Sequence, residues 1–340
     1  MKKYLRLFFG LGISAVFVYL ALRGLNLQAA FEWLKKANYY WLIPGVLIYF
    51  VGVWGRTWRW HYMLRPIKEV PMWRLFSIVC IGYMGNNIFP VRAGEVLRSY
   101  VLKRTDDIPM SASIATIVVE RVFDGLVMLL FVFIALPFVP IPDDFRIFVV
   151  GASAAFLIAL ALFFFFATQP ELTQGVYENT VRRLIPPRLR DQADAFLGRF
   201  LEGLLFFRSG RDVIMVFVTS VFIWLAETVK YWFVMQGFAH LGGGFPVPFF
   251  VLMLMNGIVN LATTIPSAPG YVGTFDAPGI AVLTAYGVNK ELAFGYTVVL
   301  HVALWFPITI LGLWYFRRRQ LAWSDVETAQ VERTSSLSSG

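Results

Sequence analysis

Long apolar runs alternate with short polar segments along almost the whole chain. A helix needs about 20 mostly apolar residues to cross the hydrocarbon core of a bilayer. The pattern therefore predicts an all-α polytopic membrane protein. Six runs reach that length and are expected to be full spans: residues 4–25, 41–64, 110–138, 145–168, 212–240 and 291–316. In the first, Lys2, Lys3 and Arg6 precede the apolar stretch Leu7–Leu22, which is longer than the apolar part of a signal peptide, so a retained helix is expected.

Two further apolar stretches are each interrupted by proline and glycine. Residues 71–89 lead into a break and a second piece over 91–104, and residues 247–265 lead into a break and a second piece over 270–288. We interpret both as re-entrant hairpins, because irregular backbone at membrane depth must be buried in protein. In the alternative, both segments cross fully and the chain has eight or more spans. The residues that mark the breaks are Pro90, Gly94, Pro266, Pro269, Gly270 and Gly273.

Basic residues fix the expected orientation, since Lys and Arg are enriched in cytoplasmic loops. This rule places both termini in the cytoplasm and makes each half span, span, hairpin, span, with the second half inverted. The expected repeats are residues 1–140 and 141–320, within one membrane domain over 1–320. The same offset, 176 residues, separates Pro90 from Pro266 and Gly94 from Gly270. Inverted repeats of this kind are typical of secondary transporters.

Composition narrows the class of protein further. Hydrophobic residues make up 58% of the chain, aromatic residues 17% and charged residues 15%, which excludes an ordinary soluble enzyme. The net charge of +9 arises at the ends of spans, so no nucleic-acid partner is expected. The single cysteine, Cys80, excludes an intramolecular disulfide, and the three histidines are scattered. No metal and no cofactor are expected.

The longest polar segment lies over residues 169–211 and is expected to be cytoplasmic. Ala193, Phe196, Leu197 and Phe200 recur at helical spacing within it. An amphipathic helix is predicted there, lying either in the membrane interface or beneath the spans. Residues 321–340 are polar and are predicted to be a disordered tail.

The first break carries unusual polarity for an apolar chain, in the run NNIFPVRAGEVLR over residues 86–98. A helix starting after Pro90 would point free N–H groups into the break, and Arg92 adds a fork suited to phosphate. Alternatively, the arginines only set the topology, with Glu95 as their internal partner. The substrate-binding candidates in this run are Asn86, Asn87, Arg92, Glu95 and Arg98.

Three ionisable residues, Glu120, Arg121 and Asp124, occur within one predicted span. Such groups are costly in hydrocarbon and should face the bundle interior. Glu120 or Asp124 is expected to neutralise an arginine of the first hairpin, or to carry a proton. The alternative is a structural ion-pair network. The candidates for charge balance or proton relay are Glu95, Glu120, Arg121, Asp124 and Glu227.

Two other charged sites lie in the second and fifth spans. Arg56 and Arg59 are surrounded by Trp54, Trp58 and Trp60, so snorkelling within an aromatic belt is the first interpretation, and a headgroup contact by Arg56 the second. Glu227 and Lys230 are three residues apart on one helix, where an internal salt bridge is expected. Lys230 is also a candidate partner for a phosphate.

The second break, TTIPSAPGYVGTF over residues 263–275, carries no charge. Its hydroxyl and backbone N–H groups can form an anion-binding nest, with a tight structural turn as the alternative. The binding candidates here are Ser267, Gly270 and Tyr271.

Three ordered motifs carry a resemblance to a known family: NxxxPxRxGExxR from Asn86 to Arg98, ERxxD from Glu120 to Asp124, and PSxPGxxG from Pro266 to Gly273. Over residues 5–316 the chain resembles the lysylphosphatidylglycerol synthase transmembrane, or flippase-like, family. The resemblance implies a lipid translocase. Synthase members carry an additional aminoacyltransferase domain, so that activity is expected to be absent from this chain.

Taken together, the residues and the resemblance predict a flippase of the cytoplasmic membrane, not an enzyme. Its expected partner is a phospholipid, an aminoacylated phospholipid or a lipid of the polyprenyl-phosphate type. The sequence contains no Walker motif for binding the phosphates of a nucleotide, so direct use of ATP is not expected. The alternatives are a membrane-embedded transferase or phosphatase acting on a lipid-linked substrate, and a scaffold protein that transports nothing.

Overall fold

A computed structural model describes residues 2–89, 93–135, 137–139, 209–265 and 267–322, with isolated positions between 147 and 198. In these ranges the chain is helical, as predicted. Most of the predicted span over residues 145–168, nearly all of the 169–211 loop and the tail beyond residue 322 lie outside the described residues. The elements are α1 (Lys2–Leu22), α2 (Leu27–Lys36), η1 (Tyr39–Trp41), α3 (Leu42–Leu64), α4 (Met72–Ile88), α5 (Ala93–Asp106), α6 (Met110–Ala135), α11 (Gly210–Ala239), α12 (Phe249–Ala262), η5 (Pro269–Tyr271), α13 (Asp276–Ala285) and α14 (Lys290–Arg318).

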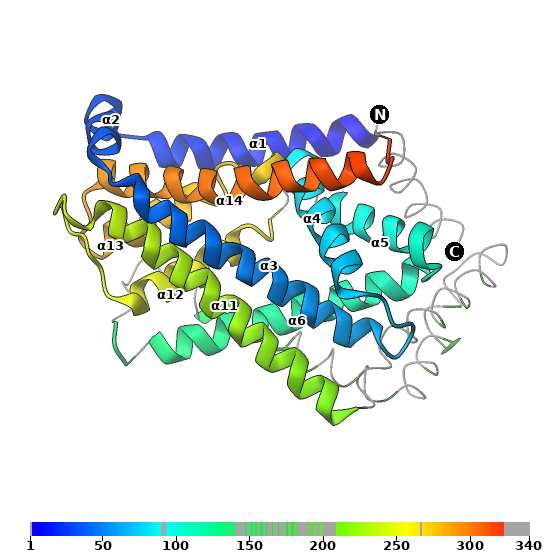
Figure 1. Cartoon of the computed structure of the whole chain (residues 1–340). Coiled ribbons are helices and arrows are strands. Elements are labelled where there is room, and N and C mark those ends of the chain that lie inside the picture. The colour runs from blue at the N-terminus through cyan, green and yellow to red at the C-terminus, as the bar shows by residue number, and fades with distance from the viewer. Residues whose placement is uncertain are drawn as a thin grey trace.

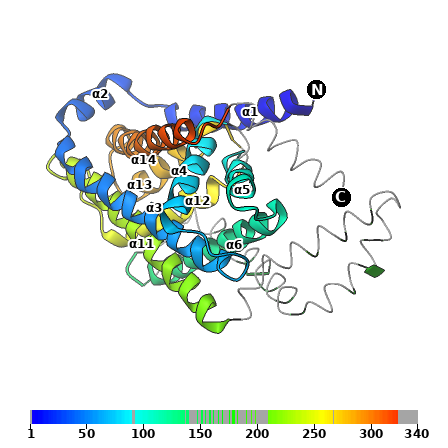
Figure 2. The same cartoon turned by 45° about the vertical axis from the view of Figure 1, so that its right-hand side comes forward.

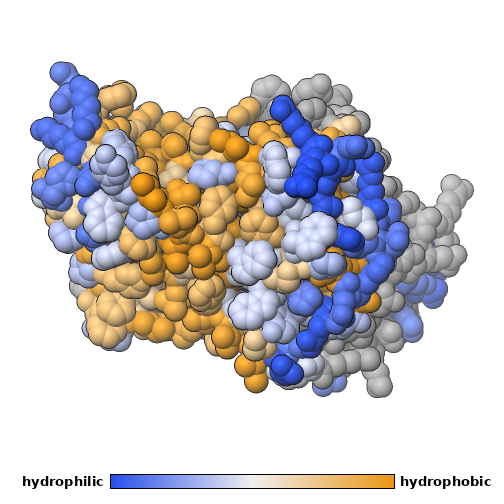
Figure 3. Space-filling model, in the orientation of Figure 1, coloured by the Kyte–Doolittle hydropathy of each residue, from blue (hydrophilic) through white to orange (hydrophobic). Residues whose placement is uncertain are grey.

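Five of the expected spans are helices of at least 21 residues: α1, α3, α6, α11 and α14. At 1.5 Å per residue, even the shortest covers about 31 Å, the thickness of a hydrocarbon core. Among the described residues, α11 and α14 are long and apolar enough to cross a membrane, and α1 with α2 makes a third span if its 81° bend is counted within one segment. Charged residues within α3 and α6 lower the hydropathy of these two helices. Figure 3 shows a broad apolar belt with hydrophilic residues gathered at both ends of the view.

Helix α2 is absent from the sequence prediction. The side chain of Asn26 caps its first turn by accepting from the Ala29 N–H at 3.1 Å. Trp33 and Leu34 pack toward the core, whereas Phe31 on the opposite face is exposed. At ten residues, α2 is too short to span, and a search for long apolar runs does not detect a helix with only one apolar face.

The first broken segment is an antiparallel helical hairpin of α4 and α5. At its open end, Arg74 of α4 pairs with Asp106 of α5 at 2.5 Å. Near its tip, a Cβ added to Gly85 would lie 2.7 Å from Gly94 Cα, so the two backbones are almost in contact. The Gly94 N–H donates to the Asn86 side chain at 2.9 Å and closes the tip. Glycine is thus required where α4 and α5 cross.

Gly94→Ala is expected to lower the free energy of unfolding by about 1–3 kcal/mol, because overpacking forces neighbouring backbone to shift. The new methyl group would overlap the Gly82 carbonyl oxygen and lie 2.5 Å from the Asn86 nitrogen. Denaturant unfolding in detergent measures the change. Gly12→Ala in α1 is the matched control, since its methyl group meets nothing within 4 Å. If both variants unfold alike, the close crossing of α4 and α5 is incorrect.

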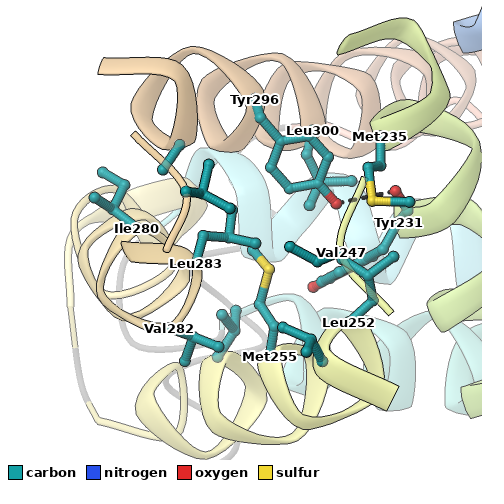
Figure 4. Close-up of a cluster of buried hydrophobic side chains, with 14 of the residues drawn as sticks. Tyr231, Met235, Val247, Leu252, Met255, Ile280, Val282, Leu283, Tyr296 and Leu300 are labelled. Carbon is teal, nitrogen blue, oxygen red and sulfur yellow. Dashed lines mark hydrogen bonds between the residues drawn. The ribbon is translucent and has the colours of Figure 1, made fainter. Parts of the chain in front are cut away.

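The second broken segment is a hairpin of α12 and α13 with η5 at its tip. The residues flanking its open end meet, since the Asn289 N–H donates to the Gly243 carbonyl at 2.8 Å. Figure 4 shows how this hairpin is held: Met255 of α12 and Leu283 of α13 point into a cluster with Tyr296 of α14. The Tyr296 hydroxyl donates to the Tyr231 carbonyl of α11 at 2.9 Å.

The helices pack in a reciprocal pattern between the two halves of the chain. Helix α3 runs along α11, as Figures 1 and 2 show. Helix α14, from the end of the chain, packs against α4 of the first hairpin, and α6, from the first half, packs against α12 of the second. Each hairpin is therefore covered by a helix of the other half, and α4 also contacts η5.

Candidate functional site

Five cations and four carboxylates meet in the interior where α3, α5, α6 and α11 converge. We call this group the charge cluster. Its helices come from both halves of the chain, and most of its side chains are buried. Its members are Arg56 and Arg59 of α3, Glu95 and Arg98 of α5, Glu120, Arg121 and Asp124 of α6, and Glu227 and Lys230 of α11.

The first hairpin joins the charge cluster through Arg98. Its Nη2 lies 2.9 Å from Glu120 Oε2, and both side chains are buried. The guanidinium also lies over the Trp60 ring, 4.0 Å from the centroid. The expected pairing of an α6 carboxylate with an arginine of this hairpin is therefore present. Glu95 faces Arg121, with Oε1 3.5 Å from Nε.

Asp124 interacts with three side chains, Arg59, Trp224 and Arg121. Its Oδ1 accepts from Arg59 Nη1 at 2.6 Å and from Trp224 Nε1 at 2.9 Å, and its Oδ2 lies 3.3 Å from Arg121. Arg59 also donates to the Ser220 hydroxyl at 2.9 Å. One carboxylate thus connects α3, α6 and α11.

The prediction that Arg56 and Arg59 snorkel to the interface is wrong. Arg59 is 1% exposed, and Arg56 points inward to Glu227, with Nη2 2.7 Å from Oε1. Carboxylates on facing helices make burial favourable, because an ion pair offsets part of the cost of dehydrating each charge. Of the neighbouring tryptophans, Trp54 and Trp58 are exposed on the apolar surface, whereas Trp60 is buried.

Glu227 lies between two cations. Besides Arg56, it binds Lys230 on its own helix, so the expected internal salt bridge is confirmed. The ammonium of Lys230 lies 4.9 Å from the centre of the Tyr49 ring, and the residue is fully buried. Lys230 is therefore paired within the protein.

Donors in the charge cluster outnumber the acceptors that face them. Arg56 Nη1, Arg59 Nε and Arg98 Nε are buried without a hydrogen-bond acceptor among the described residues, and Arg98 Nη2 meets Glu120 without hydrogen-bond geometry. Among the described residues of the charge cluster, the buried acceptor without a hydrogen-bond donor is Glu120 Oε1. An unpaired buried polar group costs about 1–3 kcal/mol, and more when it is charged. The interior is thus suited to an acceptor-rich group such as a phosphate.

The tips of the two hairpins meet on Trp305 of α14. Asn87 at the end of α4 donates to Thr309 Oγ1 at 2.8 Å and to the Trp305 carbonyl at 3.3 Å. In return, Trp305 Nε1 donates to the Asn87 carbonyl at 3.3 Å. A Cβ added to Gly270 of η5 would lie 2.8 Å from the same indole nitrogen. Pro90, Arg92 and Pro266 lie outside the described residues.

Around η5 the backbone forms a tight turn with left-handed residues, at Gly270 (φ 70°), Tyr271 (φ 61°) and Gly273 (φ 84°). Several of its N–H groups already donate within the protein: Ala268 to Ser14 Oγ, Tyr271 to the Ala268 carbonyl, and Gly273 to Asp276 Oδ2. Ser267 is buried and accepts from the Thr274 hydroxyl at 3.1 Å. These bonds favour the structural turn over an anion-binding nest.

Sequence reasoning missed one polar unit, formed by His301 and Asp276. His301 Nδ1 lies 2.8 Å from Asp276 Oδ1, and Nε2 lies 2.7 Å from the Gly270 carbonyl oxygen. The available signal was a lone histidine in the middle of a span, because ionisable groups at membrane depth generally have a function.

Comparison with known proteins shows the family to which the chain is similar. The model of the lysylphosphatidylglycerol synthase TM region matches residues 7–312. The UPF0104 membrane protein PH1989 of Pyrococcus horikoshii is 22% identical, over 94% of this chain and 98% of its own length. A UPF0104 membrane protein of Methanothermobacter thermautotrophicus is 21% identical, over 82% of this chain and 86% of its own.

A shorter match is the glycosyltransferase AglD of Haloferax volcanii, 35% identical over 25% of this chain and 14% of that protein. No solved structure gives a significant match. The family model covers nearly the whole membrane region, including both hairpins and every helix of the charge cluster. The chain therefore belongs to the family of the lysylphosphatidylglycerol synthase transmembrane region.

Proposed function

We propose that the protein is a lipid translocase that moves an anionic or phosphate-bearing lipid across the cytoplasmic membrane. The observation that carries the proposal is the set of buried guanidinium donors without acceptors in the charge cluster. Arginine forks match phosphate oxygens in geometry and charge, and a headgroup phosphate would supply the missing acceptors. The family name adds a lipid context.

The path proposed for the headgroup runs between the two hairpin tips. Asn87 and Gly270 both contact the Trp305 indole, and Arg98 links the first hairpin to the charge cluster. The acyl or prenyl chains would stay in the bilayer while the headgroup crosses. Glu95, Glu120 and Asp124 would balance the arginine charges in the empty state.

The architecture proposed for this function is an inverted repeat of six spans and two re-entrant hairpins. Reciprocal packing supports it: α14 covers the first hairpin as α6 covers the second, and α3 meets α11 between them. The open ends of each hairpin also close on themselves, at Arg74–Asp106 and at Gly243–Asn289. Both termini are proposed to be cytoplasmic. A symmetric fold with two broken segments at its centre is suited to alternating access.

The proposal is tested with the purified protein in phosphatidylcholine vesicles that contain a fluorescent phosphatidylglycerol. Dithionite bleaches only the label in the outer leaflet, so translocation appears as bleaching beyond half of the signal. We expect faster bleaching than in protein-free vesicles, and chromatography should recover the lipid chemically unchanged. A new lipid product would instead support the transferase or phosphatase alternative, and neither bleaching nor product with any phosphate-bearing lipid would refute the proposal.

A further inference from the structure

The hydrogen bonds around His301 specify how many protons the site holds. Its Nε2 faces the Gly270 carbonyl oxygen at 2.7 Å, and its Nδ1 faces Asp276 Oδ1 at 2.8 Å. A carbonyl oxygen only accepts, so Nε2 must carry a hydrogen. The contact between Nδ1 and Oδ1 needs a second hydrogen, on either the imidazole or the carboxyl group. The pair therefore holds one proton more than a neutral histidine beside an ionised aspartate.

Loss of that proton breaks one of the two hydrogen bonds. A neutral imidazole has a single N–H, so a lone pair would face either the carboxylate or the Gly270 carbonyl. Asp276 is held in place by the Gly273 N–H, which donates to its Oδ2 at 2.9 Å, and by its position in the first turn of α13. The single N–H is therefore retained by the carboxylate, and the bond to Gly270 is the one released.

Gly270 lies at the contact between the two hairpin tips. It packs against Trp305, whose indole nitrogen donates to the Asn87 carbonyl at the end of α4. Trp305 lies one turn beyond His301 on α14, so one helix face holds the tip of each hairpin. A proton bound at His301 thus stabilises the closed contact between the tips.

Among the described residues, Asp276 provides the carboxylate that lies within ion-pair distance of His301. The Phe275 ring, just before α13, lies 4.6 Å from the imidazole, measured between ring centroids. Near η5, α4 contributes Asn87 and α1 contributes Ser14, and both residues are uncharged. Helices α2, α3, α4 and α11 also pack against α14, and each carries charged groups that form ion pairs without His301. These pairs are Arg56–Glu227 between α3 and α11, Glu227–Lys230 within α11, Arg74–Asp106 on the first hairpin, and Glu32–Lys35 on α2.

We propose that His301 and Asp276 form a proton-binding site that clamps the second hairpin tip while the proton is bound and couples release of the proton to opening of the path. The site takes one proton from water as the clamp closes and returns it as the clamp opens. This inference rests on the proposed translocase function for its coupling role. The clamp itself is independent of any lipid.

The clamp is tested by the reactivity of a cysteine placed behind it. Ser267 is 5% exposed, and Cys80 is fully buried, so the parent chain serves as the unlabelled blank. We expect Ser267→Cys in the full chain to react with a maleimide faster at about pH 9 than at about pH 5, on either side of the histidine range. Asp276→Asn, added to Ser267→Cys, provides the matched control. The introduced amide can donate to Nδ1 of a neutral His301, so the clamp stays closed at both pH values.

At each pH, the labelling rate of Ser267→Cys is divided by that of Ser267→Cys with Asp276→Asn. This ratio cancels the effect of pH on the ionisation of the thiol itself. We expect this ratio to rise by about tenfold between the two pH values, which corresponds to the loss of one hydrogen bond of ordinary strength. His301→Gln, which does not titrate, should likewise remove the pH dependence specific to the clamp. A ratio that stays constant with pH would overturn the proton site, as would a pH profile of His301→Gln with Ser267→Cys that equals the profile of Ser267→Cys alone.

Translocation of fluorescent phosphatidylglycerol by the same proteins separates the two proposals. We expect its pH profile to flatten in Asp276→Asn. Clamp-dependent labelling in a protein that moves no lipid would refute the translocase function and leave the proton site standing. Translocation whose pH profile is unchanged in Asp276→Asn would refute the coupling.

Discussion

Asp124→Ala is expected to lower the free energy of unfolding by about 3–5 kcal/mol, as does the removal of one partner from other buried ion pairs. The change leaves Arg59, 1% exposed, without the carboxylate that lies 2.6 Å away. It also removes the acceptor of the Trp224 indole N–H. Because Asp124 connects α3, α6 and α11, its loss loosens the centre of the bundle. Denaturant unfolding in detergent, followed by circular dichroism, measures the effect.

A surface pair provides the control for this prediction. Lys35 and Glu32 of α2 are also an ion pair, at 2.8 Å, but both side chains are more than half exposed. Lys35→Ala is therefore expected to change the unfolding free energy by less than about 1 kcal/mol. Replacing Arg59 and Asp124 together by apolar residues should restore much of the stability lost in Asp124→Ala. An Asp124→Ala protein as stable as the Lys35→Ala protein would contradict the burial of the charge cluster.

Arg98→Lys is expected to reduce lipid translocation by about 100-fold, the effect of losing about 2.7 kcal/mol of interaction with the passing headgroup. Lysine keeps a positive charge opposite Glu120, so the fold is preserved. It lacks the Nε and Nη2 groups of Arg98, which are buried without hydrogen-bond acceptors. Arg92→Ala, at the break itself, is expected to abolish translocation in the same way. The dithionite assay measures both variants.

Arg65→Lys is the matched control for the arginine variants. Arg65 follows α3 and pairs with Asp212 at 2.9 Å, and its side chain is more than one-third exposed, outside the charge cluster. Its translocation rate should equal that of the unmodified protein. If Arg98→Lys moves lipid at the same rate as Arg65→Lys, the guanidinium of Arg98 has no part in headgroup binding.

The helices that the sequence predicts well are those defined by their own composition. The run over residues 41–64 became α3 (Leu42–Leu64), and the broken run over 71–89 became α4 (Met72–Ile88), which ends just before the break. In both, a run of about 20 mostly apolar residues gives a signal that does not depend on tertiary context. Helix α2 was missed because only one of its faces is apolar and its ten residues do not span a bilayer.

Contacts between the two halves were beyond the sequence. The periodicity of α3 shows that Arg56 and Arg59 lie near one helix face, but not that α11 brings Glu227 against Arg56 from 171 residues away. Without that carboxylate, snorkelling is the less costly state for an arginine. His301 gave the same difficulty, since its partners belong to the turn of the second hairpin, 25 and 31 residues earlier. Glu227 and Lys230 share one helix, and their pairing was predictable.

Headgroup selection is tested most directly with two lipids in the same vesicles, a fluorescent phosphatidylglycerol and a neutral fluorescent glycolipid without a phosphate. In the proposed function, buried guanidinium groups at the first hairpin bind the phosphate of a passing headgroup. The unmodified protein should therefore move phosphatidylglycerol at least about tenfold faster than the glycolipid, and Arg98→Lys should move neither above the protein-free rate. Equal rates for both lipids, unchanged by Arg98→Lys, would contradict binding of the headgroup phosphate by these guanidinium groups.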